Sequence, residues 1–388
     1  MNTPCNVDYG FSPYVEISLD NVIHNLNQIK SLLPSAVDVM AVVKDNAYGC
    51  GANMTSRVLE EQGVNFFAVA RTLEARSLRE SGIRSPILVL GPAEADDMRW
   101  GAYENIRFTL NDLADIKTWE NLDCPVKFHV AIDTGMGRQG ILPSEAGSFT
   151  LALNSSGNLT LEGAFTHLAN ADAQDSGATA KQLACFRKTL GVINDNNPGA
   201  LMVHYASSAA IMRYPPEECT MVRPGIALYG CKPDPAQDFS LDLKPVMSLK
   251  ACVVKVKRVC AGTPVSYGSV YITAIETEIA TIAVGYGQGL PRILGNTGSV
   301  LIRNKKYKIA GRVTMDYIMV DIGVDSGIAV NDEAVLMGSQ GTLAIYPDDI
   351  ALLCNTIGYE IMCCVSSCIC RRYVLDGKTV CIESPRAF

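Results

Sequence analysis

The sequence predicts an α/β fold in which a (β/α)8 TIM barrel is followed by a mostly β C-terminal domain. Short apolar segments alternate with amphipathic segments over the first part of the chain, and eight such apolar segments can be counted. Polar and reactive residues stand repeatedly at the C-terminal ends of these segments. A doubly wound open sheet would show the same alternation, but the position of the reactive residues favours the barrel.

The expected barrel domain covers residues 1–241. A helix is predicted over 21–33, with Asp20 as its cap and Pro34 at its end. Amphipathic segments at 72–81 and 177–193 predict further helices. The eight predicted strands are 37–44, 65–70, 86–91, 106–110, 125–133, 159–167, 200–206 and 221–229.

The second domain is expected over residues 242–388, because strands follow one another closely from about Leu241 onward. The boundary falls in a polar, proline-bearing segment at 232–244. One helix is predicted at 347–355. The predicted strands are 247–259, 279–284, 300–303, 306–309, 318–322 and 334–337.

The composition is that of an ordinary globular enzyme, with 48% hydrophobic and 19% charged residues among 388. A formal net charge of −7 without a basic block argues against nucleic acid as a partner. We expect no membrane association, because no apolar segment could span a bilayer and residues 1–10 do not resemble a signal peptide.

The 14 cysteines are scattered, and many lie in apolar segments (Cys252, Cys354 and Cys363 among them), which indicates reduced thiols in a cytoplasmic protein. The closest approach to a metal motif, near Cys364 and Cys368, lacks paired spacing and a histidine. We therefore expect no metal site.

The most informative residue is Lys44, which ends the apolar segment 37–43. A lysine at a strand end can simply reach solvent. Tyr48, four residues later between glycines, favours a second interpretation. A partly desolvated lysine forms Schiff bases, and a tyrosine hydroxyl can donate to a phosphate.

The segment VVKDNAYGCG at 42–51 resembles the pyridoxal-phosphate lysine motif of the alanine racemases, a family of fold-type III enzymes. The resemblance implies pyridoxal 5′-phosphate as cofactor, bound covalently by Lys44, with Tyr48 at its phosphate. Relatives more often have Ala and His at the positions of Asp45 and Cys50, which the chemistry does not require.

The segment DTGMGR at 133–138 follows the fifth predicted strand. Its glycines allow the backbone to bring Arg138 over the barrel mouth, where the guanidinium could bind a substrate carboxylate or the phenolic oxygen of the cofactor. In many relatives a lysine at the position of Ala131 supports this arginine. Here another residue or a small anion must do so.

Two histidines lie near the ends of the sixth and seventh strands. The resemblance implies that His167 connects the catalytic tyrosine with an arginine at the pyridine ring. It implies that His204 packs its ring on the cofactor and that Ser208 binds the phosphate. Without the resemblance, each histidine would be interpreted as a core residue.

Arg223, Gly225 and Ile226 close the eighth predicted strand, and barrels commonly bind phosphate after strands seven and eight. The backbone N–H groups of Gly225 and Ile226 suit that role. By resemblance, Arg223 faces the pyridine nitrogen. Because arginine stays protonated, it would keep that nitrogen unprotonated, which favours racemisation over transamination.

The second domain carries motifs that contain glycines at predicted strand ends. Taken alone, each would be interpreted as a structural feature and not as part of a site. In family order they imply that Tyr267 is the second acid/base, that Met315 binds the substrate carboxylate and that Asp316 supports the tyrosine. Tyr286 would line the substrate entry. Near the end of the chain, Tyr359 would be a further phosphate-side residue.

The resemblance extends from about Tyr14 to Tyr373. It implies a racemase that interconverts L- and D-alanine with two bases, Lys44 and Tyr267. It also implies a homodimer in which Tyr267 reaches the site of the other subunit.

Three alternatives stay open: a serine or broad-specificity racemase, a non-catalytic pyridoxal-phosphate carrier, and a decarboxylase on the same barrel. The predicted second domain with Tyr267 argues against a carrier. Arg223 stands where such decarboxylases place an acidic residue.

Overall fold

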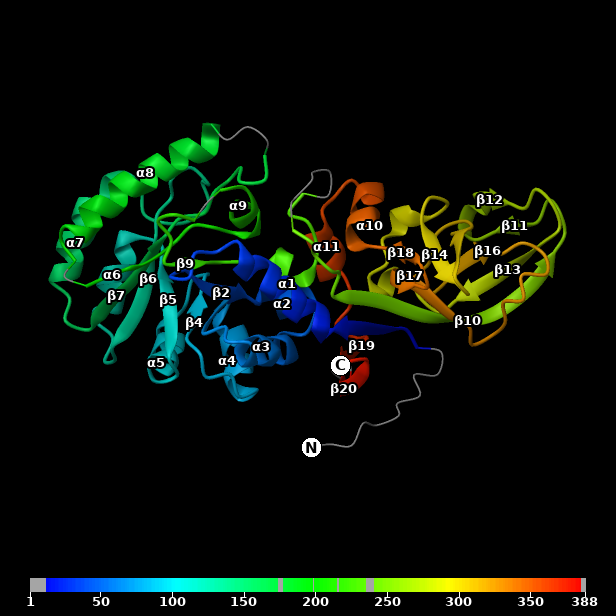
Figure 1. The fold of residues 1–388 in the computed structure, drawn as a ribbon, viewed down its shortest axis with the longest axis horizontal. Helices are drawn as coiled ribbons and strands as arrows, with labels where there is room; N and C mark the ends of the chain where they lie inside the picture. Colours follow the sequence, from blue (N-terminus) through cyan, green and yellow to red (C-terminus); the bar gives the residue numbers. More distant parts are fainter. Residues whose placement is uncertain (1–11, 174–176, 198, 215, 235–240, 385–388) are drawn as a thin grey trace.

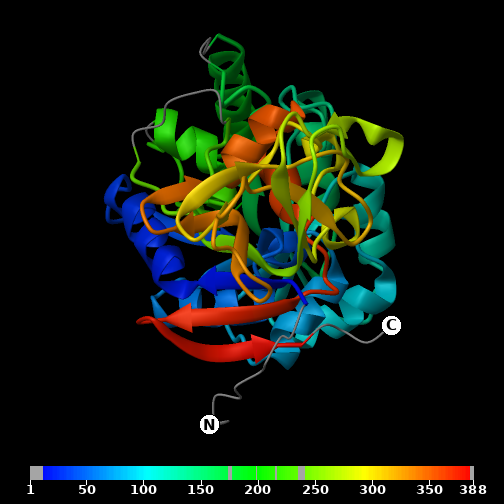
Figure 2. The ribbon, with the colours of Figure 1, turned by 90° about the vertical axis from the view of Figure 1, so that its right-hand side faces the viewer.

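The computed structural model describes residues 12–173, 177–197, 199–214, 216–234 and 241–384. Two lobes lie side by side, with a barrel at one end and a β domain at the other (Figure 1). The helix α11 (Gly358–Cys363) lies between them although it is close to the C-terminus. The view along the long axis shows the C-terminal strands beside the barrel (Figure 2).

The first lobe is the predicted barrel of parallel strands, in the order β8-β7-β6-β5-β4-β3-β2-β9. An isolated parallel bridge between Ser207 and Arg223 brings its two ends together. The strands are β2 (Asp38–Val42), β3 (Phe66–Val69), β4 (Ile87–Val89), β5 (Ile106–Leu110), β6 (Val126–Ala131), β7 (Leu159–Phe165), β8 (Met202–His204) and β9 (Met221–Val222).

Helices surround this barrel on its outer side (Figure 1). They are α1 (Leu19–Ser31), α3 (Ala52–Glu61), α4 (Thr72–Glu80), α5 (Ala95–Tyr103), α6 (Leu113–Trp119), α7 (Ala146–Asn154), α8 (Gly177–Asn194) and α9 (Ser208–Arg213). Short 3-10 turns follow at η1 (Pro143–Glu145) and η2 (Ile226–Tyr229).

Two local predictions in the barrel were wrong. The cap of α1 is Ser18, whose Oγ accepts from the Asn21 N–H at 3.2 Å, and Asp20 lies in the first turn instead. The eighth strand ends at Val222 rather than residue 229, because Pro224 and Gly225 break it before η2.

The second lobe is a β domain built on a ten-stranded sheet, as predicted. Its strands are β10 (Met247–Val259), β13 (Thr277–Ile282), β14 (Ser299–Ile302), β15 (Lys305–Lys308), β16 (Ile318–Asp321), β17 (Glu333–Gln340), β18 (Leu343–Ile345), β19 (Cys370–Leu375) and β20 (Lys378–Glu383), joined by β1 (Tyr14–Ser18). A separate pair, β11 (Pro264–Val265) and β12 (Tyr271–Ile272), lies at its far end. The helix α10 (Pro347–Cys354) and the turns η3 (Tyr267–Ser269), η4 (Tyr286–Gln288) and η5 (Arg292–Leu294) complete the lobe.

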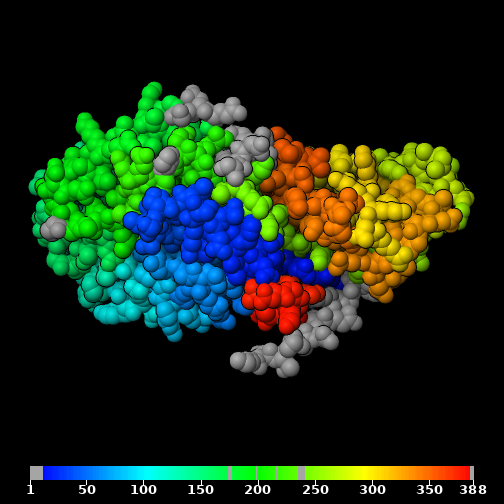
Figure 3. Space-filling view, in the orientation of Figure 1, coloured from blue at the N-terminus to red at the C-terminus, as the bar shows by residue number. Residues whose placement is uncertain are grey.

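The strand β1 belongs to the second sheet although it precedes the barrel in sequence. It pairs antiparallel with β10 and parallel with β19, which buries Val15 and Ile17 completely. The space-filling view shows the blue N-terminal segments against the red C-terminal strands where the lobes meet (Figure 3). The boundary at 241/242 stays a prediction, with β1 added to the second sheet.

One buried amide holds the segment that leaves the barrel. Asn25 on α1 is fully buried, and its Nδ2 donates to the carbonyl oxygens of Leu228 at 3.1 Å and Lys244 at 2.8 Å. Its Oδ1 accepts from the Lys244 N–H at 2.8 Å. This side chain therefore links α1 to η2 and to the segment that leads into the second lobe.

We expect Asn25→Leu to lower the free energy of unfolding by at least about 2 kcal/mol, because the change leaves buried backbone groups without partners. Urea unfolding at fixed protein concentration measures the effect. Asn27→Leu on the exposed side of the same helix is the matched control and should change stability by less than about 0.5 kcal/mol. Equal losses in both variants would contradict the assignment.

Candidate active site

A cavity of about 290 Å³ lies at the C-terminal ends of the barrel strands. Nine of the residues predicted from the sequence line it: Lys44, Tyr48, Arg138, His167, Ser208, Arg223, Gly225, Ile226 and Tyr359. The structure adds Leu90, Gln139, Phe165 and Ser207, which the sequence did not single out. Tyr359 comes from α11, so a segment beyond the barrel completes the cavity.

Lys44 enters the cavity through an unusual turn, α2 (Lys44–Tyr48). The four residues after the lysine all have positive φ, between 53° and 55°. A left-handed conformation costs roughly 1–2 kcal/mol for each residue that has a Cβ. The turn brings both the Lys44 amine and the Tyr48 hydroxyl to the cavity wall.

Contacts on every side stabilise this turn. The Asp45 N–H donates to Glu74 Oε1 at 2.5 Å, and the Ala52 N–H donates to Asn46 Oδ1 at 2.9 Å. The Tyr48 ring is buried and lies 5.0 Å from the Tyr229 ring. These hydrogen bonds and the burial of Ala47 and Tyr48 offset the backbone strain.

Gly51, just after the turn, packs against the C-terminal strands. A Cβ at this position would lie 1.8 Å from the hydroxyl oxygen of Tyr373 on β19. Arg371 of the same strand donates to the Gly49 carbonyl at 2.8 Å. The C-terminal segment therefore helps to fix the position of Lys44.

Hydroxyl and backbone groups form a cradle at one end of the cavity. Ser208 Oγ accepts from the N–H groups of Gly225 at 3.0 Å and Ala227 at 3.3 Å. A Cβ on residue 225 would lie 2.4 Å from the Tyr48 hydroxyl oxygen, so only glycine fits there. Burial raises the pKa of Tyr48 well above its ordinary value, which keeps its hydroxyl a neutral donor. Such a set of donors suits a phosphate group.

Arg223 places a buried cation at the other end. Its Nη1 donates to the His204 ring at 2.5 Å and to the His204 carbonyl at 2.6 Å. Its Nη2 donates to the Thr166 carbonyl at 2.8 Å. Within the described part of the chain these partners are carbonyl and imidazole groups, not carboxylates. Burial lowers the pKa of Arg223 to about 10, so the group stays protonated at neutral pH.

The loop that carries Arg138 is organised by Asp133. One carboxylate oxygen, Oδ1, accepts from the N–H groups of Gly135, Met136 and Gly137 at 2.9, 2.9 and 3.0 Å. Burial raises the pKa of Asp133, but these three donors and Arg138 together lower it. The rigid loop brings the exposed Arg138 to the cavity rim while Ala131 stays buried in β6.

The two histidines predicted for the site take different positions. His167 lines the cavity, and burial, Arg223, Arg138 and Lys44 lower its pKa to about 3. His204 is fully buried behind Arg223 and does not line the cavity. Its ring stacks on Phe165, with centroids 4.9 Å apart, where the sequence led us to expect packing on the cofactor.

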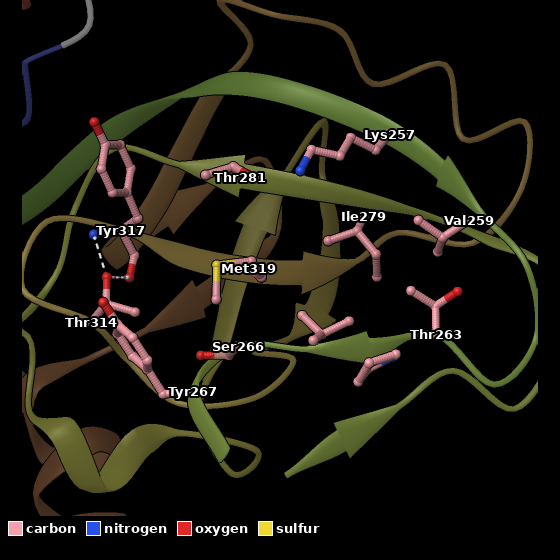
Figure 4. Close-up of a pocket in the computed structure, with 12 residues that line it drawn as sticks. Lys257, Val259, Thr263, Ser266, Tyr267, Ile279, Thr281, Thr314, Tyr317 and Met319 are labelled. Carbon is pink, nitrogen blue, oxygen red and sulfur yellow. Dashed lines mark hydrogen bonds between the residues drawn. The ribbon is translucent and has the colours of Figure 1, made fainter. Parts of the chain in front are cut away.

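The residues predicted from the second domain are not brought to this cavity within one chain. Tyr267 is 71% exposed, and it lines a separate hollow of about 470 Å³ in the second lobe (Figure 4). Tyr286 and Met315 are also exposed. Asp316 accepts a hydrogen bond from Gln288 at 3.3 Å. A single chain therefore holds one of the two expected bases in its cavity.

Across the described ranges, no group of three or more His, Cys, Asp or Glu residues could hold a metal ion. No helix of the described residues is long and apolar enough to cross a bilayer.

The fold and the cavity define a TIM-barrel enzyme with a lysine, two arginines and an anion cradle at the C-terminal ends of its strands. The alanine racemase N-terminal domain matches residues 17–233, and the alanine racemase C-terminal domain matches residues 246–373. The chain belongs to the alanine racemase family.

Individual relatives agree with this membership. The alanine racemase of Halothermothrix orenii is 40% identical over 369 residues, which cover 93% of this chain and 96% of the relative. The solved alanine racemase of Clostridium difficile 630 has a TM-score of 0.90 at 36% identity, with 97% and 99% of the two chains covered. That of Bacillus anthracis, solved with bound L-Ala-P, has a TM-score of 0.90 at 34% identity and the same coverage.

The buried histidines predict a loss of stability in acid. Burial lowers the pKa of His129 to about 3 and that of His204 well below its ordinary value, as it does for His167. The unfolded chain binds these protons near pH 6.5, so its protonation favours unfolding as the pH falls below that value. We expect the free energy of unfolding to fall between pH 6.5 and 5 by up to about 1.4 kcal/mol per pH unit for each histidine.

Urea unfolding of the cofactor-free protein at fixed concentration, from pH 7.5 to 5.0, measures this slope. His129→Asn should reduce the slope of the unfolding free energy against pH by the contribution of one histidine. A stability that does not change across this interval would contradict neutral, buried histidines.

Proposed function

We propose that this chain is a pyridoxal-phosphate-dependent racemase that interconverts L- and D-alanine. The observation that carries the proposal is the composition of the cavity. It combines Lys44, a buried Arg223 that is hydrogen-bonded to carbonyl and imidazole groups, and a hydroxyl and N–H cradle, in a chain of the alanine racemase family.

The residues of the cavity suit this cofactor. Lys44 would bind it covalently, and Tyr48, Ser208 and the cradle N–H groups would hold its phosphate. Tyr359 and Ile226 line the same cavity and would contribute on that side. When bound, the cofactor supplies an electron sink for the charge that develops at the substrate Cα.

Arg223 would determine which reaction follows. Because it stays protonated, it would donate a hydrogen bond to the pyridine nitrogen and leave that nitrogen without a proton of its own. A weaker electron sink favours return of the proton to Cα over its transfer to another carbon. This distinguishes racemisation from transamination, and a decarboxylase on the same barrel would have an acidic residue here.

Racemisation needs a base on each face of the substrate, and we assign these roles to Lys44 and Tyr267. One removes the proton from Cα, and the other returns a proton to the opposite face. Arg138 at the cavity rim would bind the substrate carboxylate, and the Met315 backbone N–H would assist. Tyr286 would line the entry, and Asp316 would support Tyr267.

The surface around Tyr267 supports a homodimer in which each subunit completes the site of the other. Large apolar side chains gather on this lobe, and an exposed apolar surface of this kind is typical of protein interfaces. They include Val270 at 43%, Ile272 at 61%, Ile275 at 71%, Ile293 at 61% and Met315 at 56% exposure. A second copy whose barrel mouth covers this surface would bring Tyr267 to Lys44.

We place the enzyme in the cytoplasm. The thirteen cysteines in the described part of the chain are all free thiols, which suits a reducing compartment.

Incubation of the cofactor-loaded protein with single L-amino acids, followed by chiral chromatography, tests the substrate. D-alanine should form fastest, and a preference for serine or an equal rate on many amino acids would favour the alternative racemases. No turnover of any amino acid would favour a carrier. Lys44→Ala is the control for racemisation without enzyme.

Borohydride reduction of the cofactor-loaded protein should fix the cofactor on the peptide that contains Lys44, because this amine is the one that lines the cavity. Peptide mass spectrometry locates the label. Lys250, partly buried in an ion pair with Glu16 at 2.9 Å, is the internal comparison and should stay unlabelled. A label on any other lysine would refute the assignment.

Mixing two inactive variants tests the shared site. Lys44→Ala and Tyr267→Phe should each have little activity alone. In a hybrid dimer one site combines both defects, and the other has intact Lys44 and intact Tyr267, so activity should return up to one working site per hybrid. Native mass spectrometry checks that subunits have exchanged. Demonstrated exchange without recovered activity would show that both bases come from one chain.

A further inference from the structure

A chain of buried polar groups extends from the cavity into the barrel interior. His204 Nδ1 lies 2.5 Å from Arg223 Nη1, and His204 Nε2 lies 2.7 Å from Nδ1 of His129 on β6. Both histidines are fully buried. His129 does not line the cavity and has no role in the function proposed above.

The direction of these hydrogen bonds follows from the arginine. A guanidinium group only donates, so His204 Nδ1 must accept. Burial and Arg223 keep His204 neutral, and its single ring proton must therefore sit on Nε2. This proton is donated to His129 Nδ1, which leaves the proton of His129 on Nε2.

The last group in this series of hydrogen bonds, the His129 Nε2–H, is unfavourable for stability. His129 Nε2 is buried and has no hydrogen-bond partner in the described part of the structure. Buried donors without partners are rare because they lose their hydration. An apolar side chain would avoid this loss, so the histidine at this position needs another explanation.

The neighbouring strand makes room for this ring. A Cβ on Gly163 of β7 would lie 2.7 Å from His129 Nδ1. A larger residue there would displace the one atom that accepts from His204. The glycine therefore leaves the space that the His129 ring needs in this position.

Stacking of His204 on Phe165 does not fix the orientation of the His204 ring in the way that its hydrogen bond to His129 does. The His204 and Phe165 rings are inclined by 12°, which fixes the plane of the imidazole. A half-turn of the ring keeps that plane but exchanges Nδ1 for a carbon. Only hydrogen bonds to both ring nitrogens distinguish the two orientations.

We propose that His129 is a positioning residue for Arg223, acting through the orientation and tautomer of His204. The acceptor at His129 Nδ1 keeps His204 Nδ1 turned toward the guanidinium, and this holds the guanidinium at the cavity. The proposal rests on the role proposed for Arg223 at the pyridine nitrogen. Loss of the acceptor would loosen Arg223 and let the bound cofactor transaminate more often.

Two substitutions of equal size separate the acceptor from the packing. His129→Asn keeps an oxygen close to the place of Nδ1, whereas His129→Leu removes it. Phe128→Leu, at the next buried position of the same strand, is the control for damage to the core alone.

The first measurement uses the cofactor-free protein and the ¹⁵N shifts of its four histidines. Wild type should show Nε2–H tautomers for His129 and His204, and the Asn variant should keep that of His204. The Leu variant should lose the hydrogen-bonded His204 signal. A different tautomer of either histidine in wild type would overturn the proposal, even if the Leu variant failed to fold.

The second measurement is the ratio of transamination to racemisation in the loaded enzyme. It should rise by about tenfold in His129→Leu, the effect of one lost hydrogen bond, and stay near the wild-type value in His129→Asn and Phe128→Leu. An unchanged ratio in the Leu variant, or equal rises in the Asn and Leu variants, would overturn the proposal.

Arg223→Lys separates this result from a failure of the proposed function. If Arg223→Lys leaves the ratio unchanged, the role of Arg223 is wrong, and with it the effect proposed for His129 on the reaction. If Arg223→Lys raises the ratio and His129→Leu does not, the role of Arg223 holds and the positioning role of His129 is rejected.

Discussion

The site depends on the buried positive charge of Arg223, whose hydrogen-bond partners in the described part of the chain are carbonyl and imidazole groups and not carboxylates. Burying a charge is costly unless hydrogen bonds compensate it, and Arg223 is compensated by carbonyl and imidazole groups at the ends of neighbouring strands. These partners leave its charge available to a group in the cavity. A carboxylate in the same place would neutralise the arginine and allow a proton on the ligand instead.

The same charge determines the state of its surroundings. It acts with burial to keep His167 and His204 neutral, so that both can accept hydrogen bonds at neutral pH. A neutral histidine beside a cation transmits orientation without adding charge. The protonation states of His167 and His204 and the direction of the hydrogen bonds at Arg223 therefore both follow from the charge of Arg223. Packing of the barrel alone would not determine them.

The sequence was sufficient for the barrel because its signals are local. Each strand is a short apolar segment, and Lys44, Arg138 and Arg223 all follow such segments, so the barrel topology brings them together. What could not be predicted depends on contacts distant in sequence. The membership of β1 in the second sheet follows from its pairing with β10 and β19, and the strands β19 and β20 were not recognised. The left-handed turn after Lys44 was also missed, because neither Ala47 nor Tyr48 favours positive φ.

Within the site, the contacts that the sequence did not predict have the same cause. Phe165 has no polar or reactive group that would single it out in the sequence. The His204 ring, which we expected to face the cofactor, nevertheless stacks on it. The sequence could not distinguish His129 from a histidine that only fills the core. The two differ in the direction and partners of their hydrogen bonds, which only the structure gives. A motif identifies residues that touch a ligand, whereas the residues that orient them are recognisable only once the partners are known.

In the proposed racemisation, the two lobes serve opposite faces of the substrate. The barrel holds Lys44, its arginines and His167 around one cavity, so a base for the face away from Lys44 would have to come from outside the barrel. A segment of the same chain does reach the cavity, since α11 delivers Tyr359. Tyr267 lies instead on η3 of the second lobe, where it lines a separate hollow and not this cavity. If the proposed roles of Lys44 and Tyr267 hold, the set of bases is complete only where two copies meet, and activity would depend on association as well as on folding.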